Sequence, residues 1–293
     1  MLLPPNRHRS LLVSQVLLLL GLTTTVAFAD GLQGFGPVVH EVRSNYSHIR
    51  VREAGTIRTM SFVRDSGEEV IESQVNFRRR DELRVPYTQY MFLNYLYQPE
   101  PKRVLIVGLG GGAMVHWLKA TDPEVTVDVL EIDPQVVDIA SRYFDVRTGG
   151  NIRVLTADAF EFFQEPGDKY DVIYMDAFLK PSEATDSTGV PLALKTDEFY
   201  QQLKDRLTEQ GVVVFNLNQH RELKEDVAAI RAAFPQVDVY RPTTAHGVIV
   251  VADTADEAHS PRDLLQRAGE LDRRFRTTFS FRLLARGLSR PRP

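Results

Sequence analysis

The stretch that decides the fold is RVLIVGLGGGAMVHWL, residues 103–118. Its apolar run leads directly into four glycines: Gly108, Gly110, Gly111 and Gly112. This pattern predicts a buried strand that turns sharply into a helix, with backbone N–H groups at the start of the helix open to a ligand. The alternative is that the glycines only allow the strand and the helix to pack closely together.

The residues after Pro101 alternate between apolar runs and amphipathic segments. We expect strands at residues 103–108, 125–133, 152–158, 170–178 and 211–217, and helices at residues 113–120, 134–144, 159–163 and 196–207. Such alternation is typical of an α/β fold with a doubly wound, Rossmann-like parallel sheet of the class I methyltransferase kind.

In the residues before Pro101, apolar and polar side chains alternate one by one in short runs. The pieces VVHEV, SHIRVRE, TIRTMSFV and EEVIESQV, within residues 38–75, alternate apolar and polar side chains and are separated by turn signals. They predict a small antiparallel β unit with one solvated face. The expected domains are a leader at 1–29, a small β domain with a connecting helix at 30–100, a Rossmann-like domain at 101–280 and a tail at 281–293.

The first 29 residues have the pattern of a secretory signal peptide. Arg7, His8 and Arg9 precede the apolar run LLVSQVLLLLGL, and a small-x-small site follows at Ala27-Phe28-Ala29. The apolar run is short for a membrane span, which needs about 20 residues. We therefore expect an exported protein, periplasmic or extracellular, which would be anchored to the membrane if the leader were not cleaved.

Composition excludes several classes of function. The 293 residues carry a net charge of −4, which argues against a nucleic-acid partner bound by a broad basic face. There is no cysteine, so disulfides, zinc–thiolate sites and cysteine nucleophiles are excluded. The seven histidines lack ligand spacing, and we expect no metal site.

Acidic residues stand at the ends of the second, third and fourth predicted strands, at Glu131, Asp158 and Asp176. Ligands of an open parallel sheet bind beyond the carboxyl ends of its strands. Glu131 is placed to hydrogen-bond a ribose diol, whereas Asp133 precedes a proline and is assigned first as a helix N-cap. Asp158, followed by Ala159, either accepts a hydrogen bond from an adenine amino group or caps a helix.

The same acids discriminate between cofactors. The spacing Gly108-x-Gly110-x-x-Ala113, with an acid after the second strand, would also suit a dinucleotide. Further acids after the third and fourth strands favour an S-adenosyl ligand over NAD. The sequence therefore predicts that an adenosyl sulfonium compound binds at this edge of the sheet.

From about residue 46 to residue 253 the chain resembles the spermidine synthases, or polyamine aminopropyltransferases. The stretches that carry the resemblance are NYSHIRV, SQVNFRRRDELRVPYTQYM, VLEIDPQVVDIASRYF and YDVIYMDAF, followed by TDEFYQQLKDRLTEQGVVVFNL. The resemblance implies that a small β domain precedes a methyltransferase-like Rossmann domain. It also implies a possible homodimer through the β domain.

Residue by residue, the resemblance implies an adenosyl site and an amine site. Glu131 would hold the ribose and Asp158, with Ala159, the adenine, beside the glycines at 108, 110 and 112. Asp176 would orient or deprotonate the attacking amine. Gln74 and Tyr87 would line the pocket of this small-molecule substrate.

Two positions depart from the family pattern: Gly111 stands where the glycine motif carries an Asp, and Leu179 where a second Asp follows Asp176. Three functions therefore stay open. The first is transfer of an aminopropyl group from decarboxylated S-adenosylmethionine to an amine such as putrescine, in a divergent, spermidine synthase-like branch. The second is methyl transfer from S-adenosylmethionine, and the third is an exported, non-catalytic protein that binds an adenosyl ligand.

Overall fold

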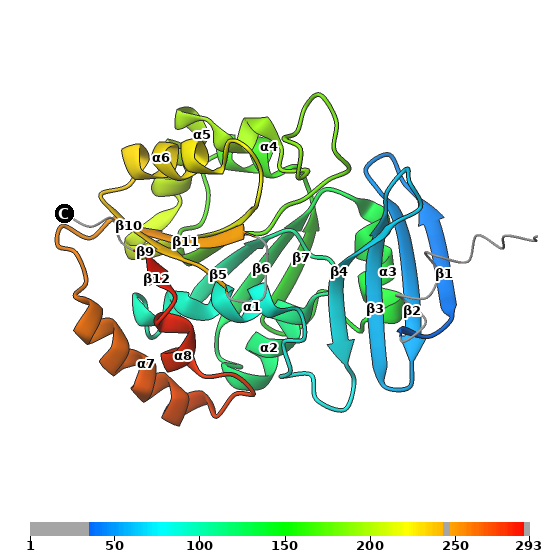
Figure 1. Ribbon diagram of the computed structural model, residues 1–293, viewed down its shortest axis with the longest axis horizontal. Coiled ribbons are helices and arrows are strands. Elements are labelled where there is room, and N and C mark those ends of the chain that lie inside the picture. Colours follow the sequence, from blue (N-terminus) through cyan, green and yellow to red (C-terminus); the bar gives the residue numbers. More distant parts are fainter. Residues whose placement is uncertain (1–34, 243–246, 290–293) are drawn as a thin grey trace, which may run out of the picture. The chain divides into compact units, whose positions relative to one another are not determined.

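The computed structural model describes residues 35–242 and 247–289, which form two β-sheets with helices packed against them (Figure 1). The predicted leader, residues 1–29, lies outside the described residues. Within the described ranges, no helix is both long enough and apolar enough to cross a membrane.

A four-stranded antiparallel sheet comes first along the chain. Its strands pair in sequence order: β1 (Val38–Arg43), β2 (His48–Ala54), β3 (Ile57–Val63) and β4 (Glu69–Asn76). This is the predicted small antiparallel unit; the homodimer expected through it stays a prediction.

Strand β4 contains a β-bulge. Met60 of β3 pairs with Ser73, but the next residue, Ser61, pairs with Ile71, so Glu72 has no partner across the ladder. A bulge bends its strand and re-aims the side chains next to it. This irregularity bears directly on the functional site.

An eight-stranded sheet follows, in the order β12-β10-β11-β9-β8-β5-β6-β7. Its strands are β5 (Arg103–Val107), β6 (Thr126–Glu131), β7 (Ile152–Thr156), β8 (Tyr170–Met175), β9 (Leu207–Asn218), β10 (Gln236–Tyr240), β11 (Gly247–Asp253) and β12 (Leu288–Ser289). Strands β5 to β9 pair in parallel, and β10, β11 and β12 extend the sheet with antiparallel pairs. The predicted Rossmann-like α/β class is confirmed.

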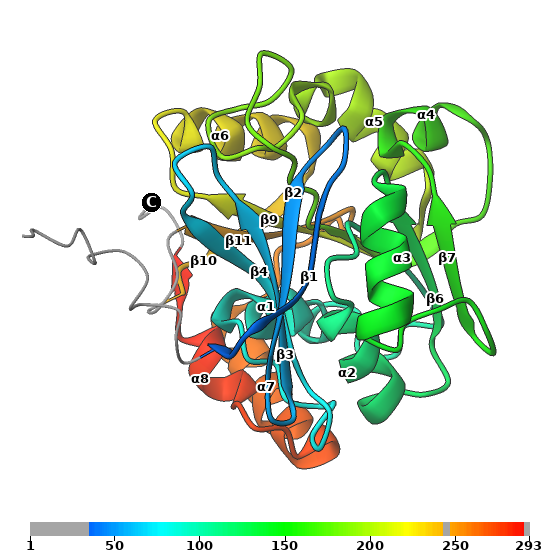
Figure 2. The same cartoon turned by 90° about the vertical axis from the view of Figure 1, so that its right-hand side faces the viewer.

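Helices cover both faces of the large sheet (Figures 1 and 2). One face carries α4 (Ala159–Gln164), α5 (Asp197–Asp205) and α6 (Leu223–Ala233). The other carries α1 (Pro86–Met91), α2 (Ala113–Thr121), α3 (Pro134–Tyr143), α7 (Pro261–Phe275) and α8 (Phe281–Ala285). This is the layered arrangement that strands with two buried faces require.

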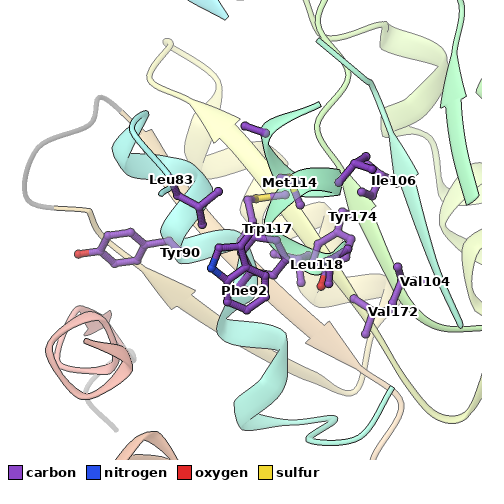
Figure 3. Close-up of a cluster of buried hydrophobic side chains, with 14 of the residues drawn as sticks. Leu83, Tyr90, Phe92, Val104, Ile106, Met114, Trp117, Leu118, Val172 and Tyr174 are labelled. Atoms are coloured by element: carbon purple, nitrogen blue, oxygen red, sulfur yellow. The ribbon is translucent and has the colours of Figure 1, made fainter. Parts of the chain in front are cut away.

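The hydrophobic core divides at the large sheet. Val104 of β5 belongs to one cluster and its neighbour Leu105 to the other, as alternation along a strand requires. The first cluster also includes Ile49 of the small sheet, so the two sheets share one core. Figure 3 shows part of this cluster around Trp117 of α2, whose ring stacks on Phe92 with centroids 3.9 Å apart. The shared core holds β4 beside the carboxyl ends of the parallel strands.

Two boundaries differ from the sequence prediction. The helix expected to reach Leu207 ends at Asp205, because Leu207 already pairs with Tyr170 at the start of β9. Residues 281–289, expected to belong to a tail, form α8 and β12. Phe281 is fully buried there, and β12 pairs with β10.

The carboxyl ends of β5 and β8 approach each other closely at Gly108. This residue has φ +98°, and a Cβ on it would lie 2.1 Å from the carbonyl oxygen of Asp176. The N–H of Asp176 donates to the Val107 carbonyl at 2.9 Å, which fixes the approach. Glycine at position 108 is therefore required by strand packing as well as by the turn.

We expect Gly108→Ala to lower the free energy of unfolding by more than about 2 kcal/mol, because it adds a backbone clash to an unfavourable φ. Urea denaturation followed by circular dichroism measures this loss. Gly55→Ala is the matched control, since Gly55 has φ +61° but nothing lies within 4 Å of its Cβ. It should cost about 1 kcal/mol. Equal losses in the two variants would contradict this account.

Candidate active site

A cavity of about 330 Å³ lies beyond the carboxyl ends of β5, β6, β7 and β8. Residues of β3, β4, α1, α2, α3 and the loop 177–195 also line it. The polar and glycine residues that line it include Ser47, Glu72, Ser73, Tyr87, Thr88, Gly108, Gly110, Gly112, Glu131, Asp133, Asp158, Asp176, Ser182 and Thr185. This is the place where ligands bind in open α/β sheets, and its size is typical of small-molecule sites.

The glycine turn forms one wall. Gly108, Gly110 and Gly112 all line the cavity, and Gly112 is the N-cap of α2. Gly111 is packed differently: a Cβ there would lie 2.9 Å from the Phe144 ring and 3.0 Å from Ser73 Oγ. The turn therefore has no room for a side chain at position 111 unless its neighbours move.

Glu131 ends β6 and is 9% exposed. Its carboxylate accepts hydrogen bonds at 2.9 Å from the backbone N–H groups of Leu109 and Asp133, which tie it to the glycine turn. Burial raises the pKa of Glu131, while the backbone hydrogen bonds oppose the shift. A carboxylate has about four acceptor positions, so a hydroxyl pair of a ligand can still bind to this group.

The two aspartates that precede helices both act as N-caps. Asp133 accepts from the N–H of Gln135 at 2.9 Å, as predicted, and Asp158 accepts from the N–H of Phe160 at 2.8 Å. Asp158 and its neighbour Ala159 also line the cavity. The two interpretations of Asp158, helix cap and ligand-facing acid, are therefore compatible.

Asp176 follows β8 and is held by two side chains. Tyr87 Oη of α1 donates to its Oδ2 at 3.0 Å, and Asn216 Nδ2 of β9 donates to its Oδ1 at 2.8 Å. Burial raises the pKa of Asp176 to about 6, and these two hydrogen bonds oppose the rise. Tyr87 lies in the cavity as expected, whereas Asn216 was missed; the signal was a polar residue within the apolar run GVVVFNL.

Gln74, which was expected to line the pocket, does not line the cavity. It donates a hydrogen bond to Thr59 Oγ1 at 2.9 Å, its partner across the small sheet. Ser73, on the opposite face of β4, and the unpaired Glu72 line the cavity instead. The family resemblance, which placed Gln74 in the pocket, carries no signal of the bulge at Glu72.

Glu72 is therefore a site residue that sequence reasoning missed. Burial raises its pKa to about 8, the negative charge of Asp176 contributes to the rise, and Arg64 opposes it. A carboxyl group with this pKa is largely protonated at neutral pH until a cation approaches. Perturbed carboxyl groups in a cavity are typical of functional sites.

The charge of the cavity has one sign. Its lining includes five acidic side chains, Glu72, Glu131, Asp133, Asp158 and Asp176, and no Lys, Arg or His among the residues that the structure describes there. Such a lining favours a cationic ligand and disfavours phosphate groups. A pyrophosphate-bearing dinucleotide would find no basic side chain in it.

A second acidic group fixes the far end of the loop 177–195. Asp186, His220 and Asp226 lie within metal-ligand reach of one another, but the ammonium of Lys195 contacts both carboxylates and is 2.6 Å from Asp226. His220 Nε2 is 3.0 Å from Asp226. The lysine supplies the cation of this group and anchors the loop to α6.

Comparison with known proteins agrees with this geometry. A family described as "Spermine/spermidine synthase domain" matches residues 89–250. The polyamine aminopropyltransferase of Vibrio vulnificus (strain CMCP6) is 30% identical over 263 residues, which cover 88% of this chain and 85% of that protein. A probable spermidine synthase from Corynebacterium glutamicum ATCC 13032 matches with a TM-score of 0.65 at 18% identity, covering 79% of this chain and 87% of that one. Human methyltransferase-like protein 13, in complex with SAH, matches with a TM-score of 0.60 at 25% identity, covering 67% and 94%.

The Rossmann-like sheet, the glycine turn and the acids at the strand ends define the fold class that spermidine synthases share with methyltransferases. Within that class, the small antiparallel sheet and the length of the sequence match assign the chain to the spermidine synthases and not to the methyltransferases. The chain belongs to the spermine/spermidine synthase family, as the resemblance predicted, and it is a transferase.

The raised pKa of Asp176 predicts a pH-dependent stability. Between about pH 4 and pH 6 the folded chain keeps a proton that an unfolded Asp releases, so this group lowers the free energy of unfolding as pH rises through that window. We expect Asp176→Asn to be more stable than the wild type at pH 8 by about 1 to 3 kcal/mol, and to show no such gain at pH 4.

Urea denaturation at the two pH values measures this difference. Asp256→Asn is the control, because Asp256 is exposed and does not line the cavity. A gain for Asp176→Asn that is the same at pH 4 and pH 8 would show that burial of the charge is not its cause.

Proposed function

We propose that the protein transfers an aminopropyl group from decarboxylated S-adenosylmethionine to an amine acceptor such as putrescine. Membership of the spermine/spermidine synthase family supports the reaction class. The observation that carries the proposal is the cavity lined by five acidic side chains and, among the residues that the structure describes, no basic one. Both reactants of this transfer are cations, and an anionic cavity in a protein interior stabilises cations.

The same lining supports the decarboxylated donor over S-adenosylmethionine. The two compounds share the sulfonium and the ammonium group, but S-adenosylmethionine also carries a carboxylate. Burying that carboxylate among acids, without a basic partner, would be unfavourable. The donor that lacks the carboxylate avoids this cost.

We assign the donor's nucleoside to the residues at the ends of β6 and β7. Glu131, held by the backbone of the glycine turn, would accept the ribose hydroxyls. Asp158 and Ala159 would border the adenine, and Gly108, Gly110 and Gly112 would allow the ligand to approach the backbone. No metal has a part in this proposal.

The chemical step is a displacement at carbon. The lone pair of the acceptor nitrogen forms a bond to the propyl carbon next to sulfur, and the C–S bond breaks with its electrons passing to sulfur. Neutral methylthioadenosine leaves, and the new ammonium loses a proton. Asp176 is ionised at neutral pH, given its pKa of about 6, and is placed to orient the amine and accept that proton. Tyr87 and Asn216 fix its two oxygens.

Methyl transfer is the second candidate. It is favoured by the match to human methyltransferase-like protein 13 at 25% identity. The absence of an acid at position 111 suits it as well, because an acid at that position is typical of polyamine enzymes. The two functions use different donors, S-adenosylmethionine for methyl transfer and its decarboxylated form for aminopropyl transfer. One assay with both donors therefore separates them.

We expect the wild type, given decarboxylated S-adenosylmethionine and 1,4-diaminobutane, to release methylthioadenosine and an aminopropylated amine in equal amounts. Liquid chromatography with mass detection measures both products. Asp176→Asn should lower kcat by about 100-fold or more, and the exposed-site variant Asp256→Asn should not. Methylated amine formed from S-adenosylmethionine would contradict the proposal in favour of methyl transfer, and no product from either donor would favour the non-catalytic binder.

We also propose that the protein is exported. Support comes from the basic residues at 7–9, the apolar run at 11–22 and the Ala27-Phe28-Ala29 site. N-terminal sequencing of the protein from fractionated cells tests this: we expect the exported fraction to begin at Asp30. Recovery in the cytoplasm with residues 1–29 intact would contradict it.

A further inference from the structure

Positive charge is concentrated near the carboxyl end of the sequence. Residues 261–293 contain nine arginines and three acids, although the whole chain has a net charge of −4. Residues 1–260 therefore have a net charge of −10. An anionic surface attracts the basic part of such a molecule and repels the remainder, so it orients the molecule as it approaches.

Two of these arginines stabilise the position of α7. Arg267 Nη1 donates to the carbonyl of Leu96 at 2.8 Å, and Arg274 Nη1 donates to the carbonyl of Pro99 at 2.6 Å. Both guanidinium groups are therefore used in packing α7 against the segment that precedes β5.

Three other arginines, Arg276, Arg282 and Arg286, are exposed where α7 and α8 meet (Figure 1). Asp272 of α7 accepts from the backbone N–H of Phe281 at 2.6 Å and from that of Arg282 at 3.3 Å. These bonds hold the start of α8 against the last turns of α7 and use the carboxylate of Asp272. None of the three arginines forms an ion pair with a residue in 35–242 or 247–289.

A fourth arginine and a leucine complete this surface. The backbone N–H of Arg241, just after β10, donates to the carbonyl of Gly287 at 3.0 Å, so Arg241 lies beside Arg286 and is also exposed. Leu283 is 63% exposed, more than any other large apolar side chain among the described residues, and lies between Arg282 and Arg286 along α8. We call the surface made by these five residues the basic face: Arg241, Arg276, Arg282, Leu283 and Arg286.

An exposed leucine among arginines matches the chemistry of a lipid headgroup layer. Lipid phosphates pair with guanidinium groups, and the acyl region directly below them accepts an apolar side chain. An acidic protein or a nucleic acid would also pair with the arginines, but its charged groups would give Leu283 no apolar partner. The combination therefore favours lipid over these other anionic partners.

We propose that the basic face docks the protein on an anionic lipid surface, with the arginines at the headgroup phosphates and Leu283 inserted between the headgroups. None of the five residues lines the cavity, so the inference goes beyond the proposed function and does not depend on it. The negative charge of residues 1–260 would keep the rest of the molecule turned away from the lipid.

The fluorescence of Leu283→Trp in the full chain tests the inference directly. The native chain has one tryptophan, Trp117, which is fully buried, so a change on adding lipid reports the introduced indole. We expect a blue shift with vesicles of equal parts phosphatidylglycerol and phosphatidylcholine, and none with phosphatidylcholine alone. Raising NaCl from about 0.1 M to about 1 M should reverse the shift, because the Debye length falls from about 10 Å to about 3 Å. No shift with the anionic vesicles, or equal shifts with both kinds, would overturn the inference.

Leu192→Trp is the control for the place of insertion. Leu192 is 48% exposed on the loop 177–195, outside the basic face, and does not line the cavity. Because an indole reports its own surroundings, we expect no blue shift from this position with either kind of vesicle. A shift as large as that of Leu283→Trp would show that lipid is not contacted through the basic face.

Removing two charges tests the role of the arginines. Adding Arg282→Gln and Arg286→Gln to Leu283→Trp should raise the lipid concentration that gives half of the shift at least about 10-fold. The matched pair is Arg142→Gln and Arg147→Gln, which removes the same charge from exposed positions outside the basic face and should change that concentration less than twofold. Equal effects of the two pairs would overturn the inference, because net charge alone would then govern binding.

Discussion

The site depends on one constraint: two carboxyl groups, Glu72 and Asp176, are buried in a cavity to which the described part of the chain contributes no basic side chain. Isolated charges are costly in a protein interior unless they are paired or hydrogen-bonded. Tyr87 and Asn216 compensate Asp176 in part, and no residue within 35–242 or 247–289 hydrogen-bonds the carboxyl group of Glu72. The folded protein therefore carries an unfavourable electrostatic energy that a cationic ligand can remove.

Backbone geometry places this pair where a ligand can reach it. The contact between Gly108 and the Asp176 carbonyl brings the ends of β5 and β8 together, so that the glycine turn and the acid face one cavity. The shared core holds β4 against the same edge of the sheet. Lys195 fixes the loop 177–195 through two carboxylates, and that loop covers the cavity from another side. Chemistry at this edge thus depends on elements from both sheets.

Much of this arrangement could be predicted from local sequence signals. The apolar run and glycines of residues 103–118 predict the strand, the turn and the helix, because those features depend on neighbours in the chain. The acids at Glu131, Asp158 and Asp176 could be placed at one edge, since parallel strands share their carboxyl ends. Gln74 was assigned to the pocket by the family resemblance alone and does not line the cavity. Glu72 was overlooked because a bulge depends on pairing between strands, which leaves no local signature. Residues 281–289 were likewise missed, because only tertiary packing makes them a helix and a strand.

The central claim is that the cavity selects cations and rejects a ligand carboxylate. Isothermal titration calorimetry with decarboxylated S-adenosylmethionine and with S-adenosylmethionine tests it most directly, because these ligands differ only in that carboxylate. The account predicts that the decarboxylated compound binds at least about 10-fold more tightly. Equal affinities, or tighter binding of S-adenosylmethionine, would contradict it.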